Sequence, residues 1–160
     1  MNRERLHEHT RRHEAVRRKL YFDSLGILTG GIGHALGSVG VPVEVQHAML
    51  APGVMDRDLG LETIERWFLA DMAEHEQGAR HLAMLRNVDF DVLTDERQEV
   101  LIEMCFQMGV TGLGGFVKMW TALAEQDWHE AARQGLDSKW ARADSPARAE
   151  ELMGLMRGTE

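Results

Sequence analysis

The sequence predicts an α+β fold that is mostly helical, with a small antiparallel sheet in the first half of the chain. Apolar residues recur at helical spacing over most of the second half, whereas an early segment, Leu20–Gly33, has strand-forming residues on both sides of a turn. The chain has 160 residues, 44% hydrophobic and 28% charged, which suits a single domain of ordinary size. The single cysteine, Cys105, excludes a framework of internal disulfides and is expected to be a buried thiol, so packing must stabilise the fold.

The first half of the chain predicts a helix followed by a hairpin. The helix runs from about Arg3 to Arg12 or slightly beyond. Tyr, Phe, Ile and Thr then flank the turn Asp23–Gly26, which makes Leu20–Gly33 a β-hairpin. Further on, Pro42 can open a short helix over Val43–Met49.

The chain after about residue 60 is predicted to form helices with recognisable starts. A long helix from about Glu62 to Leu85 is indicated by apolar residues at helical spacing, namely Leu61, Ile64, Phe68, Met72 and then His75. Thr94 is a plausible N-cap for the next helix. Asp127 and Glu130 have the spacing of a capping box, and Ser145-Pro146 predicts an N-cap followed by a proline at the first helical position.

Three polar residues around the predicted hairpin, Glu14, Asp23 and Thr29, are candidates for chemistry. One carboxyl lies where a helix ends and another where a hairpin turns, so the two can occupy unlike environments. Glycoside hydrolysis needs this difference, because one acid must stay protonated and one carboxylate charged. Taken singly, each residue would be ordinary solvated surface. Their order, and the glycine-rich segment Gly30–His34 that follows, favour the functional interpretation.

The segment from Glu14 to His34 resembles the active-site segment of the T-even phage type lysozymes, family 24 of the glycoside hydrolases. That family has a Glu, then Tyr-x-Asp, a Gly, a Thr and Gly-x-Gly-His. The same order and spacing are found here in Glu14, Tyr21-Phe22-Asp23, Gly26, Thr29 and Gly31-Ile32-Gly33-His34. A second block resembles the C-terminal lobe of the family and comprises Leu101–Gly109, Thr111-Gly112, Gly115-Phe116, Trp128, Glu130, Trp140, Pro146 and Arg148-Ala149. The resemblance covers nearly the whole chain and is weakest over about residues 37–57.

The resemblance implies a lysozyme-like two-lobed fold and a single catalytic domain over residues 1–160. The small sheet lobe would span about residues 15–60, and a connecting helix about residues 62–85. The helical lobe would span about residues 86–160 and include the N-terminal helix.

The resemblance also implies roles for individual residues. Glu14 would be the general acid, Asp23 would hold or activate the attacking water, and Thr29 would help to position that water. The family inverts the anomeric centre, so the two carboxyls are expected about 6.5–9.5 Å apart. Supporting residues would be Arg148, which matches an arginine that pairs with the catalytic Glu, and the pair His34 and Asp71; substrate-binding residues would be Ala35, Phe106, Gln107 and Gln134.

Some features are left open by the sequence. Burial would favour the protonated form of Glu14, whereas an ion pair with Arg148 would favour the charged form. Gly30 replaces a β-branched residue of the family pattern, which weakens strand propensity beside Thr29. Ala15 stands where the family has a glycine, so the backbone there must tolerate a Cβ.

Charge limits the choice of partners. The chain carries a net charge of −8, and repulsion from an anionic wall predicts modest or strongly salt-dependent activity on intact cells. The basic first twenty residues could contact nucleic acid, but a polar helix is the simpler interpretation, so no nucleic-acid partner is expected. His9 and His13 share a helix face, yet the arginines nearby would repel a cation, so no metal site is expected. No cofactor is expected either.

The expected function is that of an endolysin, which cleaves the β-1,4 bond between N-acetylmuramic acid and N-acetylglucosamine in peptidoglycan. We expect a monomer made in the cytoplasm of the host bacterium. The first residues show no export signal, so a separate holin-type membrane protein would give it access to the periplasm and the cell wall. One alternative is a hydrolase of a related aminosugar polymer such as chitin. Another is a catalytically silent wall-binding or structural phage protein, although the complete set Glu14, Asp23 and Thr29 argues against silence.

Overall fold

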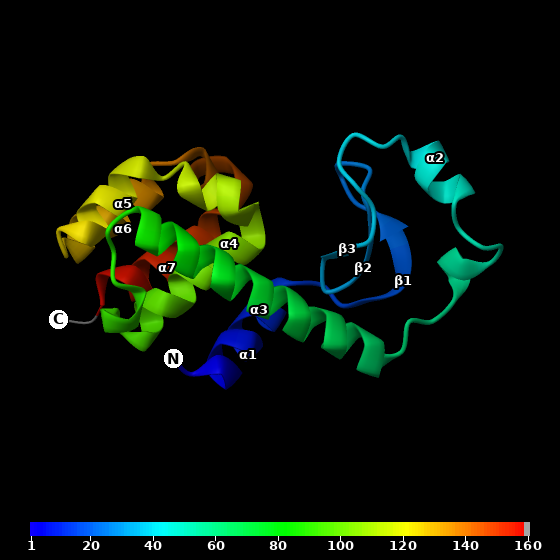
Figure 1. Cartoon of the computed structure of the whole chain (residues 1–160), viewed down its shortest axis with the longest axis horizontal. Coiled ribbons are helices and arrows are strands. Elements are labelled where there is room, and N and C mark those ends of the chain that lie inside the picture. The colour runs from blue at the N-terminus through cyan, green and yellow to red at the C-terminus, as the bar shows by residue number, and fades with distance from the viewer. Residues whose placement is uncertain (159–160) are drawn as a thin grey trace. The chain divides into compact units, whose positions relative to one another are not determined.

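The structure, a computed structural model, describes residues 1–158 and confirms the expected mostly helical α+β fold with a small antiparallel sheet (Figure 1). The chain divides into a small unit, His7–Asp71, and a helical unit, Met1–Leu6 with Met72–Glu160. Both divisions fall inside helices, so the N-terminal helix is shared between the units, whereas the sequence assigned it to the helical lobe.

The elements in chain order are α1 (Arg3–His13), β1 (Arg17–Phe22), β2 (Leu28–Gly31), β3 (His34–Ala35), α2 (Val43–Ala48), a 3₁₀ turn (Val54–Asp56), α3 (Leu61–Leu85), a second 3₁₀ turn (Phe90–Val92), α4 (Asp95–Gly114), α5 (Val117–Ala124), α6 (Trp128–Leu136), a π-helical turn (Trp140–Asp144) and α7 (Pro146–Arg157).

The sheet of the small unit has the strand order β1-β2-β3, and both strand pairs are antiparallel. Thr29 in the middle strand lies opposite Tyr21 on one side and Ala35 on the other. The sequence predicted the first two strands but not β3, because a strand of two residues leaves no periodic pattern. Gly31 and Gly33, at φ of +64° and +73°, allow the chain to reverse between β2 and β3.

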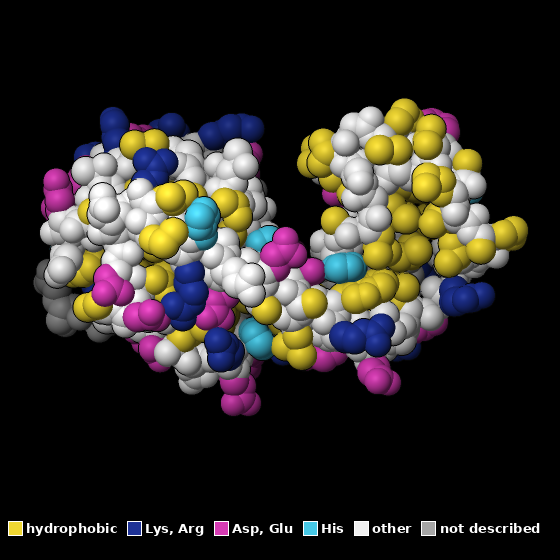
Figure 2. Space-filling view, in the orientation of Figure 1, with side chains coloured by type: hydrophobic (Ala, Val, Ile, Leu, Met, Phe, Trp, Pro, Cys, Tyr) yellow, Lys and Arg dark blue, Asp and Glu magenta, His cyan; other side chains and the backbone are white. Residues whose placement is uncertain are grey.

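The core of the small unit lies between the sheet and the first half of α3. The buried apolar residues of this unit include Ile27, Leu28 and Ile32 around the hairpin, and Ile64 and Phe68 of α3, which are 3% and 1% exposed. Figure 2 shows many apolar side chains on the visible surface of this unit as well. The exposed apolar residues include Leu25, Val39, Val45 and Met49.

In the helical unit, α4 is buried continuously from Gln98 to Cys105, and α5, α6 and α7 are grouped with it (Figure 1). The thiol of Cys105 is fully buried, as expected. Trp120 of α5 is also fully buried, and its indole N–H donates to the carbonyl of Leu113 at 3.0 Å. Across residues 1–158 no single helix is long and apolar enough to cross a membrane; α4 and α5 pass such a test only as a pair, bent by 99°.

The predicted helix starts are correct in position, and two of the three side chains cap as expected. Thr94 accepts from the N–H of Arg97 at 3.4 Å, and Asp127 accepts from the N–H of Glu130 at 2.9 Å. The other half of the predicted capping box is missing, because the Asp127 N–H donates to the carbonyl of Ala122. Ser145 does stand at the N-cap of α7, but its side chain makes no capping hydrogen bond. Its hydroxyl is instead engaged by Gln107 of α4, so the prediction of a capping role for this side chain was wrong.

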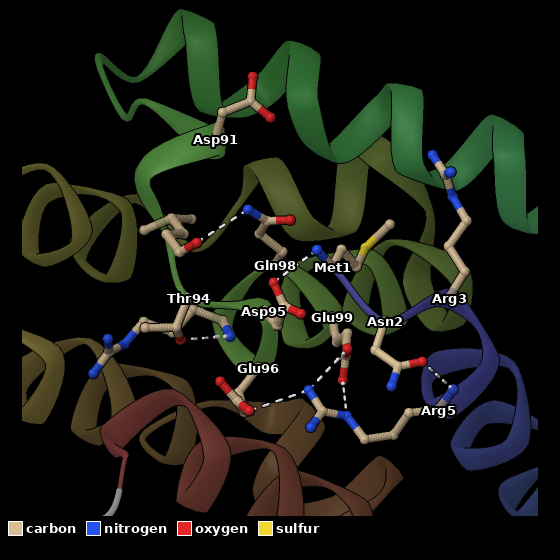
Figure 3. A network of polar contacts seen from close by, with 12 residues as sticks. Met1, Asn2, Arg3, Arg5, Asp91, Thr94, Asp95, Glu96, Gln98 and Glu99 are labelled. Carbon is tan, nitrogen blue, oxygen red and sulfur yellow. Dashed lines mark hydrogen bonds and ion pairs between the residues drawn. The ribbon is translucent and has the colours of Figure 1, made fainter.

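The N-terminal segment is anchored to α4 by an arginine fork (Figure 3). Arg5 donates to both carboxylate oxygens of Glu99, with Nε–Oε2 at 3.0 Å and Nη2–Oε1 at 2.9 Å, and it also contacts Glu96 at 3.1 Å. Glu99 is 5% exposed. Its hydrogen bond is the main reason that the pKa of Arg5 is raised. Arg5 therefore supplies the positive charge that a buried carboxylate needs.

Candidate active site

The predicted catalytic residues Glu14, Asp23 and Thr29 all lie in the small unit. Glu14 is half-buried in the bend between α1 and β1, and Asp23 is half-buried directly after β1. The Asp23 carboxylate builds its own turn, because Oδ1 accepts from the backbone N–H of Leu25 at 2.8 Å and of Ile27 at 2.9 Å. Both bonds fall on Oδ1, which leaves Oδ2 able to accept from another donor.

Thr29 and Asp23 are held by the same residue, Ile27. The Thr29 side chain is buried, and its hydroxyl donates to the carbonyl of Ile27 at 2.9 Å. The same carbonyl accepts from the backbone N–H of Asp23 at 3.0 Å, while the N–H of Ile27 donates to the Asp23 carboxylate. A shift of Ile27 would therefore displace both side chains together.

Tyr21 connects Glu14 and Asp23 electrostatically. Burial is the main cause that raises the pKa of Tyr21; the negative charges of Asp23 and Glu14 add to it, and the Arg17 guanidinium, 5.5 Å from the ring centre, opposes it. Both carboxylates therefore act on one phenol group. An irregularity in the pairing of β1 between Arg17 and Tyr21 marks the kind of bulge that bends a strand and redirects its side chains. The sequence treated Tyr21 as a strand former, although its place inside the motif was a signal for the site.

The predicted His–Asp pair is in contact within the small unit. Nδ1 of His34 on β3 lies 2.9 Å from both carboxylate oxygens of Asp71 on α3. The imidazole also stacks on Trp67, with ring centres 4.7 Å apart. Since α3 packs against the sheet, this contact fixes β3 and, through the strand pairing, Ala35 beside Thr29. The side chain of Ala35 is exposed there.

Of the substrate-binding residues expected in the helical unit, Gln134 on α6 lines a cavity. The cavity has a volume of about 640 Å³. The Gln134 amide donates to Glu130 at 2.7 Å, and with Arg133, whose hydrogen bond is the larger cause, it lowers the pKa of Glu130 to about 2. The remaining lining residues are Met108, Gly112, Gly115, Phe116, Val117, Lys118, Met119, Asp137, Ser138, Lys139, Trp140 and Asp144.

Gln107 and Phe106 make contacts that the sequence did not predict. The Gln107 carbonyl oxygen accepts from the Trp140 indole N–H at 2.9 Å, and its amide nitrogen donates to Ser145. Gln107 thus joins α4 to the π-helical turn that walls the cavity. The Phe106 ring packs edge-to-face on His75, with ring centres 5.2 Å apart.

Two backbone irregularities adjoin the same cavity. The π-helical turn Trp140–Asp144 is closed by the bond from Ser145 N–H to the Trp140 carbonyl at 2.8 Å. Within α4, Gly109 has φ of 72° and ψ of 171°, a conformation that only glycine adopts readily. Irregularities of both kinds are enriched at functional sites. The glycine in the Phe-Gln-Met-Gly run was visible in the sequence, whereas the π-turn was not.

Arg148 is buried in the helical unit and forms an ion pair with Glu103, with Nη2–Oε2 at 3.2 Å. The sequence did not single out Glu103, although a carboxyl between the apolar residues Ile102 and Met104 was a signal, because charged residues are rarely buried without a partner. Glu14 and Arg148 belong to different units. Their pairing therefore stays a prediction.

Comparison with known proteins places the chain in a family. The family model described as phage lysozyme matches residues 11–158. The chain is also 30% identical over 158 residues to the pre-baseplate central spike protein Gp5 of Enterobacteria phage T4. That alignment covers 94% of this chain but only 27% of the relative, so the chain spans about a quarter of the relative's length. Because the family model matches almost the whole chain, this protein belongs to the phage lysozyme family.

Proposed function

We propose that the protein is a lysozyme that hydrolyses the β-1,4 bond between N-acetylmuramic acid and N-acetylglucosamine in peptidoglycan. The family membership supports a wall glycan as the substrate. The observation that carries the proposal is that Asp23 and Thr29 are both hydrogen-bonded to Ile27, in the unit that also contains Glu14. Burial is the main cause of the raised pKa of Tyr21, and the negative charges of Asp23 and Glu14 both add to it.

The hydrogen bonds suggest how the water is oriented. The Thr29 hydroxyl gives its hydrogen to Ile27, so its oxygen can only accept from a water. The Asp23 carboxylate likewise only accepts, and Oδ2 is available for it. A water that donates one hydrogen to each of these oxygens turns a lone pair toward the anomeric carbon. Glu14 then protonates the departing glycosidic oxygen, and attack from the opposite face inverts the configuration.

The remaining predicted residues would support substrate binding in this proposal. Ala35 presents a small exposed side chain opposite Thr29, which leaves room for a sugar beside the water. Gln134 offers an amide at the cavity of the helical unit. The contact between His34 and Asp71 would hold the sheet in place.

We propose two versions of the biological setting. As an endolysin, a monomer made in the host cytoplasm would depend on a holin-type membrane protein to reach the periplasm. The similarity to a baseplate central spike protein favours a second version, in which the chain acts on the wall as part of a phage particle. Two experiments separate these versions. One compares the lysis of cells that express the chain with and without a holin, and the other searches for the chain in purified phage particles.

Release of reducing ends from purified peptidoglycan and from chitin tests the activity. We expect the parent protein to release reducing ends from peptidoglycan. Glu14→Gln should abolish this release and leave the circular dichroism spectrum unchanged. Equal or faster release from chitin would change the substrate. No release from either polymer would favour a silent wall-binding or structural protein. Parent-like activity of Glu14→Gln would remove Glu14 from the proposed role.

A further inference from the structure

We propose that Gln46 is a positioning residue for the hydrolysis, acting on Asp23 and Thr29 through Ile27. The inference rests on the proposed function for its catalytic meaning. Gln46 lies on α2, in the stretch where the resemblance to the family is weakest, and it is 6% exposed. A buried amide in a short helix needs partners, because an unsatisfied one costs free energy.

The partners of Gln46 bracket Ile27. The amide nitrogen donates to the carbonyl of Gly26 at 2.8 Å and to that of Val41 at 2.7 Å. The amide oxygen accepts from the backbone N–H of Leu28 at 3.0 Å. One side chain therefore holds the residues directly before and after Ile27, and it ties them to the loop that leads into α2.

On the solvent side, the turn before Ile27 is held by Asp23 alone among the residues that the structure describes. Ser24 and Leu25 in the turn are exposed, and Gly26 has φ of +73°. The Asp23 carboxylate holds the turn from one side, through the N–H groups of Leu25 and Ile27. Gln46 holds it from the other. Without the amide, Gly26 and Leu28 would lose these bonds, and Ile27 would be held only by its own bonds to Asp23 and Thr29 and by its buried side chain.

Gly37 provides an independent sign that the amide position is built into the fold. A Cβ at Gly37 would lie 1.9 Å from Oε1 of Gln46 and 2.9 Å from the backbone nitrogen of Leu28. Both distances are too short for any side chain. The backbone of Gly37 also donates to the carbonyl of Leu28 at 3.0 Å. The amide therefore occupies a space that exists only because residue 37 is glycine.

The helical unit offers a matched control in Gln98. This glutamine is also 6% exposed, and its amide nitrogen also donates to two backbone carbonyls, those of Phe90 and Leu93, both at 3.0 Å. Gln98→Met removes the same kind of buried amide as Gln46→Met and leaves a side chain of similar length. The two variants differ in whether the held backbone carries Asp23 and Thr29.

The kinetic test uses the full chain and soluble peptidoglycan strands, at a temperature where circular dichroism shows every variant folded. For Gln46→Met we expect kcat to fall about tenfold to a hundredfold, the range caused by small misplacements of catalytic groups, with KM nearly unchanged. Gln98→Met should lower Tm but keep the parent kcat. A parent-like kcat in folded Gln46→Met, or an equal loss in Gln98→Met, would overturn the proposal.

Residue-resolved hydrogen exchange gives a readout that does not depend on activity. We expect the Leu25 and Ile27 amides to exchange at least about tenfold faster in Gln46→Met, and no change at these amides in Gln98→Met. Gly37→Ala keeps Gln46, but its Cβ displaces the amide and also presses on the Leu28 backbone. It should reproduce both the faster exchange and the loss of kcat, and it serves as the second variant if Gln46→Met does not fold. Unchanged exchange and kcat in Gly37→Ala would refute the positioning role. If the parent protein itself releases no reducing ends, the proposed function fails, while the exchange rates still decide whether Gln46 holds Ile27.

Discussion

The anchor between Arg5 and Glu99 leads to a quantitative prediction about stability. Arg5→Met keeps the aliphatic stem of the side chain and removes the guanidinium that donates to both oxygens of Glu99 at 2.9 and 3.0 Å (Figure 3). The Glu99 carboxylate is 5% exposed, so the variant leaves a buried charge without its main partner. We therefore expect the variant to be clearly less stable than the parent.

The size of the loss follows from the exposure of the two partners. Breaking a fully buried pair by removing one member costs about 3–5 kcal/mol. The Arg5 side chain is 46% exposed, so water can partly replace the lost bonds, and we expect about 2 kcal/mol. For a chain of this size, that corresponds to a fall in Tm of about 4–8 °C.

Thermal and urea unfolding followed by circular dichroism measure this loss, with Arg3→Met as the control on the same helix. Arg3 is 68% exposed, and its partner Glu76 is also held by Arg80 at 3.0 Å. Arg3→Met should therefore cost about 0–1 kcal/mol. A double-mutant cycle of Arg5→Met with Glu99→Gln should give a coupling energy of about 1–2 kcal/mol. A loss no larger than that of Arg3→Met, or a coupling energy near zero, would refute the reasoning.

Two further predictions concern single buried positions. A Cβ at Gly30 would lie 2.8 Å from Cδ2 of Leu20 and 3.1 Å from Cδ1 of Leu59, so Gly30→Val should cost about 1–3 kcal/mol in urea unfolding. A gain in stability, as strand propensity alone suggests, would contradict this packing argument. Burial raises the pKa of Cys105 to about 11, so the thiol is protonated at neutral pH and should react with Ellman's reagent only after denaturation. Rapid reaction of the native protein would show that the thiol is accessible.

Much of the fold could be predicted from local sequence patterns. The apolar spacing placed the long helix at residues 62–85, and the structure has it at Leu61–Leu85. The hairpin around Asp23 is equally local, because the turn is stabilised by the side chain of Asp23 itself. Such features depend on residues close together in sequence, so their pattern carries the information.

What could not be predicted depends on contacts between distant segments. Ser145 has the sequence of a helix cap, but Gln107, from another helix, takes up its hydroxyl. Gly30 looked like a weakness in strand β2, and only the packing of Leu20 and Leu59 explains why a side chain does not fit. Gln46 accepts a hydrogen bond from the N–H of Leu28, which lies 18 residues away in the sequence. No local sequence pattern predicts hydrogen bonds between such distant residues.

The stereochemistry of the first product tests the proposed mechanism most directly. Proton NMR of the anomeric region, recorded within the first minutes of peptidoglycan hydrolysis and before mutarotation, shows which anomer is released. If a water held by Asp23 and Thr29 attacks opposite Glu14, the new reducing end must appear as the α-anomer. Initial release of the β-anomer would mean that a covalent or otherwise retaining route operates, and it would contradict the roles proposed for Asp23 and Thr29.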